Sequence, residues 1–408
     1  MNSVHSIALL KNVVQPYAWG STTAIPHLLG IPNPSGAPQA ELWMGAHPKA
    51  PSLVETGDGW LPLDVLIRRC PDDVLGAEAA AAFDGTLPFL FKVLAAAAPL
   101  SIQAHPGREH AREGFERENR SGLAIDAPQR NYRDPHHKPE CVCALTPFSV
   151  LCGFRHPAAV LETLRMLCPR ELRAEIAAFT GRCNSAGLKQ LFGRLLSLDP
   201  ARCRNAVAEA VAAAAGSREE GLGWIPSLAR HYPDDVGALA PALMNVLRLE
   251  PGQALFLSEG VLHSYLEGTA IEIMANSDNV VRGGLTPKHV DLPELFKVVR
   301  FDRHDVQRVR TENREPTETV YLTPAAEFAL SCIRLQAGDR FCSRAGRNVE
   351  ILLCIDGKAV AQEMAPAGRV VDIAQGSCVL VPAAAPAYRL TGPATVYKAT
   401  VPGRETIR

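Results

Sequence analysis

The sequence predicts a mainly β protein with an inserted helical domain, and three observations lead to this prediction. Short apolar runs separated by turn residues fill the stretch from Leu87 to Phe154 and return after residue 248. Between them lies a stretch rich in Ala, Leu, Arg and Glu with helical periodicity. The residues best suited to bind a metal stand on both sides of that stretch. If they form one site, the β part must close across the helical insertion.

Chain length indicates more than one domain, because 408 residues exceed the size of a typical single domain. The hydrophobic content of 47% is sufficient to form more than one core. We expect residues 1–154 to form the first part of a catalytic β domain and residues 155–247 to form the helical insertion. Residues 248–315 would complete the catalytic domain, and residues 316–408 would form a C-terminal β domain.

The first β part contains four apolar runs bounded by Pro and Gly, which is typical of antiparallel strands. They are Phe89–Leu94, Leu100–Ile102, Cys141–Leu145 and Ser149–Cys152.

The helical insertion follows from apolar residues at helical spacing. They recur from Ala158 to Leu164 and from Leu188 to Leu196, and Asp199 before Pro200 is a helix start signal.

Strand patterns return at 254–257 and 270–274, so His263 is expected in the turn region between two strands. Further apolar runs at 349–355 and 377–381 predict the C-terminal β unit.

A weak internal repeat relates the two β units. Gly252 to His263 and Gly376 to Ala387 share a glycine, an apolar strand and a small-residue turn, and Ala387 stands where the first copy has His263. We interpret both as related jelly-roll, cupin-like barrels of which only the first keeps a metal. Chance similarity of two glycine-led strands is the alternative.

Charge and cysteine usage narrow the function classes. Lys and Arg number 42 against 43 Asp and Glu, without blocks of like charge, which argues against nucleic acid or an anionic membrane as partner. No signal-peptide pattern or membrane-length apolar stretch is present, so a cytoplasmic protein is expected. The eleven cysteines lack paired CxxC motifs and are expected to be buried, reduced thiols, including Cys141 and Cys143.

Four potential metal ligands stand in three short segments: Gln103, His105, Glu140 and His263. If Leu100 to Ala104 is extended, alternate side chains leave one face, and the spacing aims Gln103 and His105 at one point. Two imidazoles and two oxygen ligands without thiolates favour an open catalytic zinc site over a closed structural one. Ligand types leave Fe²⁺ and Mn²⁺ open.

A dense group of polar residues lies near these ligands in the sequence: Ser101, His137, Lys138, Tyr265, Glu272, Asp278, Arg282 and Lys288. We expect the run from Asn276 to Lys288 to be a loop across the mouth of the site, with a solvated surface loop as the alternative. Arg offers a planar fork to phosphate or an oxyanion, and Lys a movable charge.

Several longer motifs carry a family resemblance from about Asn12 to Phe301. They are Tyr17–Ser21, Glu41–Pro48, Gln103–Pro106, His137–Glu140, Tyr232–Gly237, the segment around His263, and Met274–Lys288. In these segments the chain resembles the type I mannose-6-phosphate isomerases. Beyond residue 316 the likeness is one of general architecture.

The resemblance implies a zinc-dependent aldose-ketose isomerase that interconverts D-mannose 6-phosphate and D-fructose 6-phosphate, with one zinc ion per chain. It implies that Gln103, His105, Glu140 and His263 are the zinc ligands and that Arg282 is catalytic. The remaining residues that it places in active-site motifs are Ser101, Lys138, Tyr265, Glu272, Asp278 and Lys288. The resemblance also implies a role in carbohydrate metabolism and GDP-mannose biosynthesis, but it does not imply in which direction the reaction runs.

The chemistry of such an isomerase requires removal of a carbon-bound proton and stabilisation of a cis-enediol(ate). We expect Arg282 to stabilise the enediolate or bind phosphate, and Lys288 to bind phosphate. Glu272 is our first choice as base, because an apolar strand surrounds it and burial can raise the pKa of a carboxyl. Asp278, Lys138, His137 and a water on the zinc ion remain open as alternatives.

Two rival functions belong to other classes. A cupin oxygenase would more often use an iron site of two histidines and one carboxylate, and a sugar-phosphate sensor would bind ligand without turnover. The expected partner is a small-molecule sugar phosphate, without nucleic acid or membrane. A monomer is expected, and the sequence leaves oligomers open.

Overall fold

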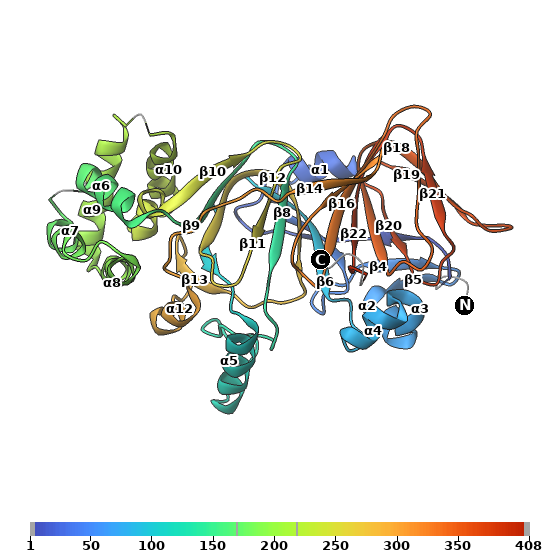
Figure 1. The fold of residues 1–408 in the computed structure, drawn as a ribbon, viewed down its shortest axis with the longest axis horizontal. Coiled ribbons are helices and arrows are strands. Elements are labelled where there is room, and N and C mark those ends of the chain that lie inside the picture. The colour runs from blue at the N-terminus through green and yellow to red at the C-terminus, as the bar shows by residue number, and fades with distance from the viewer. Residues whose placement is uncertain (1–4, 169, 218, 404–408) are drawn as a thin grey trace.

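The strands form two antiparallel sheets, one of ten strands and one of twelve, in a computed structural model that describes residues 5–168, 170–217 and 219–403. Figure 1 shows the ten-stranded sheet in the middle of the molecule, with helices between residues 157 and 243 at one end and the twelve-stranded sheet at the other. The prediction of a mainly β fold with a helical insertion is therefore confirmed.

The ten-stranded sheet contains three of the four predicted metal ligands, and the fourth, His105, directly follows one of its strands. Its main path runs β10 (Met244–Leu249), β9 (Phe148–Phe154), β12 (His263–Ala275), β6 (Phe89–Ala96), β3 (Glu41–Gly45) and β2 (Val13–Gln15). Off this path lie β7 (Ile102–Ala104), β8 (Glu140–Ala144), β11 (Ala254–Leu257) and β13 (Val281–Gly284). All eight residues of β6 are buried, which suits its apolar run with a single lysine.

Strand β12 brings the functional segments together. At its start His263 is opposite Gln103 of β7, and further along Glu272 is opposite Lys92 of β6. The same strand also pairs with β8 and β9. Segments on both sides of the helical insertion thus meet on one strand, as a single site requires.

The helical insertion contains α6 (Pro157–Leu167), α7 (Arg173–Thr180), α8 (Ser185–Leu196), α9 (Pro200–Ala214), α10 (Trp224–His231) and α11 (Ala240–Leu243). Short 3-10 turns, Glu220–Gly223 and Val236–Leu239, precede α10 and α11. Asp199 caps α9 by accepting hydrogen bonds from the amides of Ala201 and Arg202, so the helix start read from the sequence is confirmed.

The twelve-stranded sheet mixes the two ends of the chain. Its strands are β14 (Thr311–Glu315), β15 (Glu318–Tyr321), β16 (Ala329–Leu335), β17 (Arg340–Cys342), β18 (Glu350–Glu363), β19 (Val370–Ala374), β20 (Cys378–Val381), β21 (Tyr388–Thr391), β22 (Ala394–Thr400), and the N-terminal β1 (Ala8–Lys11), β4 (Leu53–Thr56) and β5 (Gly59–Pro62). Ala8 pairs with Leu380. The exact domain boundaries stay a prediction.

Among the described residues, six more helices lie outside the insertion: α1 (Ala24–Leu29), α2 (Leu63–Arg69), α3 (Pro71–Leu75), α4 (Ala77–Ala82), α5 (Arg108–Arg120) and α12 (Leu292–Val298). Helices α5 and α12 lie on the same side of the ten-stranded sheet in Figure 1. The core is continuous between the two sheets, since Phe91 and Ile273 belong to the same buried cluster as Tyr321 and Tyr397.

Strand register agrees with the proposed internal repeat. Leu257 of β11 pairs with Glu140 at the start of β8, and Val381 of β20 pairs with Glu350 at the start of β18. In the second unit, however, Glu350 lies 3.3 Å from Arg347 Nε and 3.5 Å from Lys398 Nζ. Side-chain cations thus accompany the second carboxylate. That only the first unit keeps a metal stays a prediction.

Three details of the sequence interpretation are wrong. His263 does not lie in the turn region between two strands but is the first residue of β12, because it pairs with Gln103 of β7 and Cys152 of β9. The run from Asn276 to Lys288 is not a loop throughout, because Val281–Gly284 forms β13 by pairing with β7. Eight cysteines are buried as expected, but Cys183 and Cys342 are exposed and Cys70 is half-buried. All eleven are free thiols. In the described part of the chain, no helix combines the length and apolar character needed to cross a bilayer.

Candidate functional site

Three of the four predicted ligands converge at the ends of adjacent strands. His105 directly follows β7, Glu140 begins β8 and His263 begins β12. One ligand atom from each lies within 4.8 Å of the others, and all three residues are buried. Glu140 stands between the imidazoles, with Oε1 3.2 Å from His105 Nε2 and Oε2 3.3 Å from His263 Nε2.

Backbone carbonyls fix the orientation of both imidazoles. His105 Nδ1 lies 2.8 Å from the carbonyl oxygen of Asn279, and His263 Nδ1 lies 2.9 Å from that of Val261. Because a carbonyl can only accept, each Nδ1 donates and each Nε2 is left with a lone pair. Burial lowers the pKa of His105 to about 4, which keeps the ring neutral. Imidazoles in this orientation are suited to bind a metal.

Unpaired polar atoms support the same conclusion. His105 Nε2, Glu140 Oε2 and His263 Nε2 are buried without a hydrogen-bond partner. Such atoms normally have partners in a folded protein, and a cation would satisfy all three together. Burial alone would raise the pKa of Glu140, but the groups around it, with the Lys138 ammonium 3.1 Å away, hold it well below its usual range. The residues present therefore fit a divalent metal such as zinc.

Gln103, the fourth predicted ligand, lies on β7 between two strands of the site. It is directly opposite His263 on one side and Arg282 on the other. Directly paired residues in a sheet project from the same face, so Gln103, His263 and Arg282 share one face. This register places the amide and the guanidinium beside the His–Glu–His group.

A buried ionic network lies further along β12. Glu272 accepts hydrogen bonds from Lys92 Nζ at 3.0 Å and from Tyr265 Oη at 2.8 Å. Glu41 Oε1 lies 3.6 Å from the same ammonium, and Glu41 Oε2 accepts from Trp43 Nε1. Burial opposes the charge on Lys92, but Glu41 and Glu272 raise its pKa above the usual value. Glu272 thus has two buried donors that its apolar strand did not reveal.

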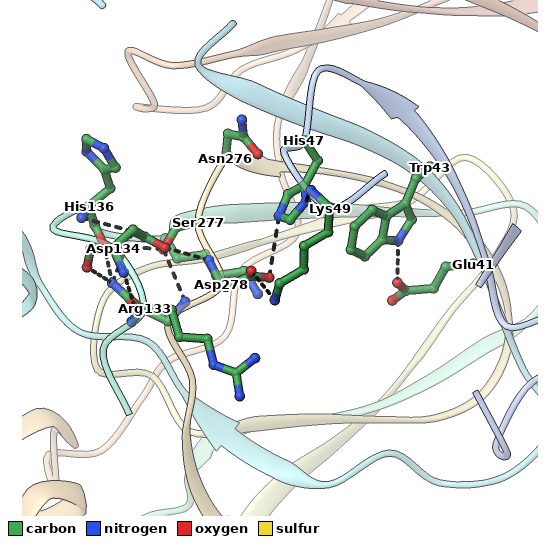
Figure 2. Close-up of polar contacts among 12 residues, drawn as sticks. Glu41, Trp43, His47, Lys49, Arg133, Asp134, His136, Asn276, Ser277 and Asp278 are labelled. Carbon is green, nitrogen blue, oxygen red and sulfur yellow. Dashed lines mark hydrogen bonds and ion pairs between the residues drawn. The ribbon is translucent and has the colours of Figure 1, made fainter. Parts of the chain in front are cut away.

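Asp278 is paired with Lys49 and His47 at the rim of the site. Its carboxylate lies 2.6 Å from Lys49 Nζ and 3.4 Å from His47 Nε2, while its amide donates to Asp134 (Figure 2). Burial would raise the pKa of Asp278, but His47 and Lys49 lower it well below the usual range. Asp278 is therefore a carboxylate at neutral pH.

Three cations near the site lack partners. Among the described residues, the side chains of Arg133, Arg282 and Lys288 take part in no hydrogen bond or ion pair, and Figure 2 shows Arg133 extending away from the Asp278 contacts. Burial and the charge of Arg133 lower the pKa of Arg282. Burial, Arg282 and Arg133 lower the pKa of Lys288. Mutual repulsion of this kind favours binding of an anion.

The remaining predicted residues occupy different positions. Lys138 Nζ lies 3.1 Å from Glu140 Oε1, next to the His–Glu–His group. Ser101 precedes β7 and is half-buried. His137 lies in the segment before β8, with both ring nitrogens against carboxylates, those of Glu259 and Glu327.

Sequence reasoning missed several residues of this site: Glu41, His47, Lys49, Lys92, Arg133, Asp134 and Asn279. A signal existed for Lys92, which is the one charge in an apolar strand. His47 and Lys49 lie in or beside the Glu41–Pro48 motif, but nothing in the sequence links them to Asp278, 229 residues beyond Lys49.

Comparisons with known proteins agree with this geometry. A family model described as phosphomannose isomerase type I, catalytic domain, matches residues 7–157. The mannose-6-phosphate isomerase of Salmonella typhimurium is 42% identical over 358 residues, covering 87% of this chain and 90% of that protein. The human enzyme of the same name is 33% identical over 387 residues, covering 86% of this chain and 88% of that protein.

A solved structure is also similar over almost the full length. The crystal structure of a mannose 6-phosphate isomerase with zinc bound superposes with a TM-score of 0.91 at 38% identity. The superposition covers 97% of this chain and 99% of that one.

Proposed function

Because this chain belongs to the type I phosphomannose isomerase family, we propose that it interconverts D-mannose 6-phosphate and D-fructose 6-phosphate with zinc as its cofactor. The observation that carries the proposal is the buried His105–Glu140–His263 group with its unpaired ligand atoms. An enzyme of this class is an isomerase, specifically an intramolecular oxidoreductase.

Zinc would be held by His105, Glu140 and His263, with Gln103 as the fourth ligand. When bound, zinc supplies Lewis-acid stabilisation of negative charge on the sugar oxygens. The Nδ1–carbonyl hydrogen bonds hold both rings in the ligating orientation before metal binds. Lys138, 3.1 Å from Glu140, offsets the carboxylate charge and offers a movable donor to the sugar.

The phosphate group is assigned to Arg282 and Lys288, and Arg133 joins them as a third cation. Support comes from the lack of partners for all three side chains among the described residues and from the lowered pKa values of Arg282 and Lys288. We expect Lys288→Gln to raise the KM for mannose 6-phosphate and to weaken competition by inorganic phosphate. The zinc content should not change, because Lys288 is not among the predicted zinc ligands and its side chain pairs with none of them in the described part of the chain.

Proton transfer between C1 and C2 through a cis-enediol(ate) is assigned first to Glu272. This carboxylate is buried, and Lys92 and Tyr265 fix its orientation. Of the alternatives, Asp278 is paired with Lys49 and His47, and His137 has both nitrogens engaged. Lys138 remains the principal competitor, because its ammonium lies beside Glu140.

A pair of variants separates these two candidates. If Glu272 is the base, Glu272→Gln loses about 10²–10⁴-fold in turnover and in solvent-deuterium incorporation at C2, with zinc and sugar binding retained. Near-normal exchange in Glu272→Gln, together with its loss in Lys138→Met, would reassign the role to Lys138.

The function itself is tested by incubating purified protein with mannose 6-phosphate and following fructose 6-phosphate by NMR. Turnover should disappear after chelator treatment and return with zinc. His105→Ala should abolish it, whereas His231→Ala, at the exposed end of α10, should not. Tight binding of sugar phosphate without turnover in the zinc-loaded protein would instead support a sensor, and oxygen consumption with Fe²⁺ would support an oxygenase.

A further inference from the structure

Four charged residues form an ionic cluster that the isomerase chemistry above does not use. Glu327 Oε1 lies 2.7 Å from His137 Nε2 and 2.6 Å from Arg108 Nη2. Glu259 Oε1 lies 3.0 Å from His137 Nδ1. Glu327 is 6% exposed, so the contact with His137 is largely shielded from water. We call Arg108, His137, Glu259 and Glu327 the four-residue clamp.

Each metal-binding segment supplies one member of the clamp. Arg108 stands three residues after His105, His137 three residues before Glu140, and Glu259 four residues before His263. The segments also touch through the backbone, because the Gly260 amide donates to the His105 carbonyl at 2.9 Å. Glu259 packs so closely over Gly107 that a Cβ there would lie 2.4 Å from Glu259 Oε2.

The fourth member comes from the other sheet. Glu327 lies between β15 and β16 of the twelve-stranded sheet, and its carboxylate pairs with both Arg108 and His137. Since carboxylates can only accept, both nitrogens of His137 donate and the ring is an imidazolium. Two cations and two carboxylates then balance, and removing Glu327 leaves the clamp with an excess positive charge.

We propose that Glu327 is a positioning residue through which the C-terminal β unit holds the three metal-binding segments in ligating geometry. The proposal rests on the proposed function only in identifying the metal as catalytic. His137 is, on this account, a fixed cation of the clamp and not a proton carrier. Groups that orient metal ligands typically change metal affinity or activity 10–100-fold when replaced. Glu327 contacts residues that neighbour the metal ligands and not the ligands themselves, so we expect an effect in the lower part of that range.

The alternative is that Glu327 makes a purely structural contact between the two β units. A matched control variant distinguishes this alternative from the proposal. Glu318 is also a buried carboxylate of the C-terminal unit. It pairs with Lys398 Nζ at 2.6 Å and accepts a hydrogen bond from Ser331, and neither of these partners lies in a metal-binding segment. Glu327→Gln and Glu318→Gln make the same chemical change in the same unit. Both should lower thermal stability, and only Glu327→Gln should affect the metal.

The experiment measures zinc affinity of the full chain by competition with a chromogenic chelator, alongside kcat, KM and thermal midpoint. We expect Glu327→Gln to weaken zinc binding about 10-fold, to lower kcat of the partly loaded enzyme, and to leave KM for mannose 6-phosphate nearly unchanged. Glu327→Asp should restore part of the affinity, because it keeps the charge. Glu318→Gln should retain wild-type zinc affinity.

Zinc affinity in Glu327→Gln equal to that of the wild type, with a stability loss like that of Glu318→Gln, would overturn the proposal. The result is independent of the substrate assignment. If the wild-type protein binds zinc but does not convert mannose 6-phosphate, the proposed function fails while the clamp is still tested by metal affinity. If Glu327→Gln does not fold, the single change Arg108→Gln provides the same test from the exposed side of the clamp, where Arg108 is 66% exposed.

Discussion

Replacement of Lys92 by methionine tests the buried ionic network most severely. Methionine keeps most of the volume of the side chain and removes its charge. Lys92 is 5% exposed and neutralises two carboxylates, Glu272 at 3.0 Å and Glu41 at 3.6 Å. Without the ammonium, two carboxylates remain in the core, with Tyr265 and Trp43 as their only side-chain donors in the described part of the chain.

The expected loss follows from these distances. At an effective dielectric constant of about 20, each contact contributes roughly 5 kcal/mol of gross attraction, most of which is offset by the desolvation of the charges. Removing one partner of a buried pair costs about 3–5 kcal/mol, because the other charge stays buried without compensation. We therefore expect Lys92→Met to lower local stability around β6 and β12 by about 3–5 kcal/mol.

Hydrogen exchange of the β6 and β12 amides in metal-free protein measures this loss locally, which avoids assuming two-state unfolding of a chain with several units. Lys49→Met is the control, because Lys49 is 52% exposed and its pair with Asp278 should contribute at most about 1 kcal/mol. An opening free energy in Lys92→Met within 1 kcal/mol of the wild type would refute the reasoning.

Three further predictions concern other parts of the chain. Gly114→Ala should destabilise the protein by about 1–3 kcal/mol, because the new Cβ would lie 2.4 Å from the Tyr132 ring; an unchanged urea midpoint would contradict this. Asp199→Ala should cost about 1 kcal/mol through loss of the α9 cap, measured by hydrogen exchange within that helix. Burial would raise the pKa of Glu318, but Lys398 lowers it. Its stabilising contribution is therefore complete above an ordinary Glu pKa of about 4.3 and is lost as pH falls below it. At acid pH, the free energy of unfolding should fall less steeply with decreasing pH in Glu318→Gln than in the wild type. An identical slope in both proteins would count against this pairing.

Local sequence patterns predicted much of the fold and of the metal site. Asp199–Pro200 gave the start of α9 because an N-cap is a property of neighbouring residues. The Gln103/His105 spacing predicted one site because alternation is intrinsic to a strand; Gln103 lies in β7 and His105 directly follows it. That Gln103 is a ligand stays a prediction. The ligands on either side of the insertion do meet, since β12 pairs with both β7 and β8.

What the sequence could not reveal depends on contacts between distant segments. Val281–Gly284 is a strand only because β7 lies beside it, and its Val-Arg-Gly-Gly sequence has little strand character of its own. Asp278 pairs with Lys49 and with His47, which lies 231 residues earlier in the chain. His137 pairs with Glu327, which lies 190 residues later. Their charges are visible in the sequence, but their partners are set by the register of the two sheets.

The most direct test of a zinc-dependent isomerase is a titration of metal-free protein with zinc, in which bound metal and conversion of mannose 6-phosphate are measured on the same samples. We predict that turnover rises in proportion to bound zinc and saturates at one zinc ion per chain, and that His105→Ala neither binds zinc at this site nor turns over substrate. Full turnover in metal-free protein, or a folded chain with one zinc bound and no turnover, would contradict the account.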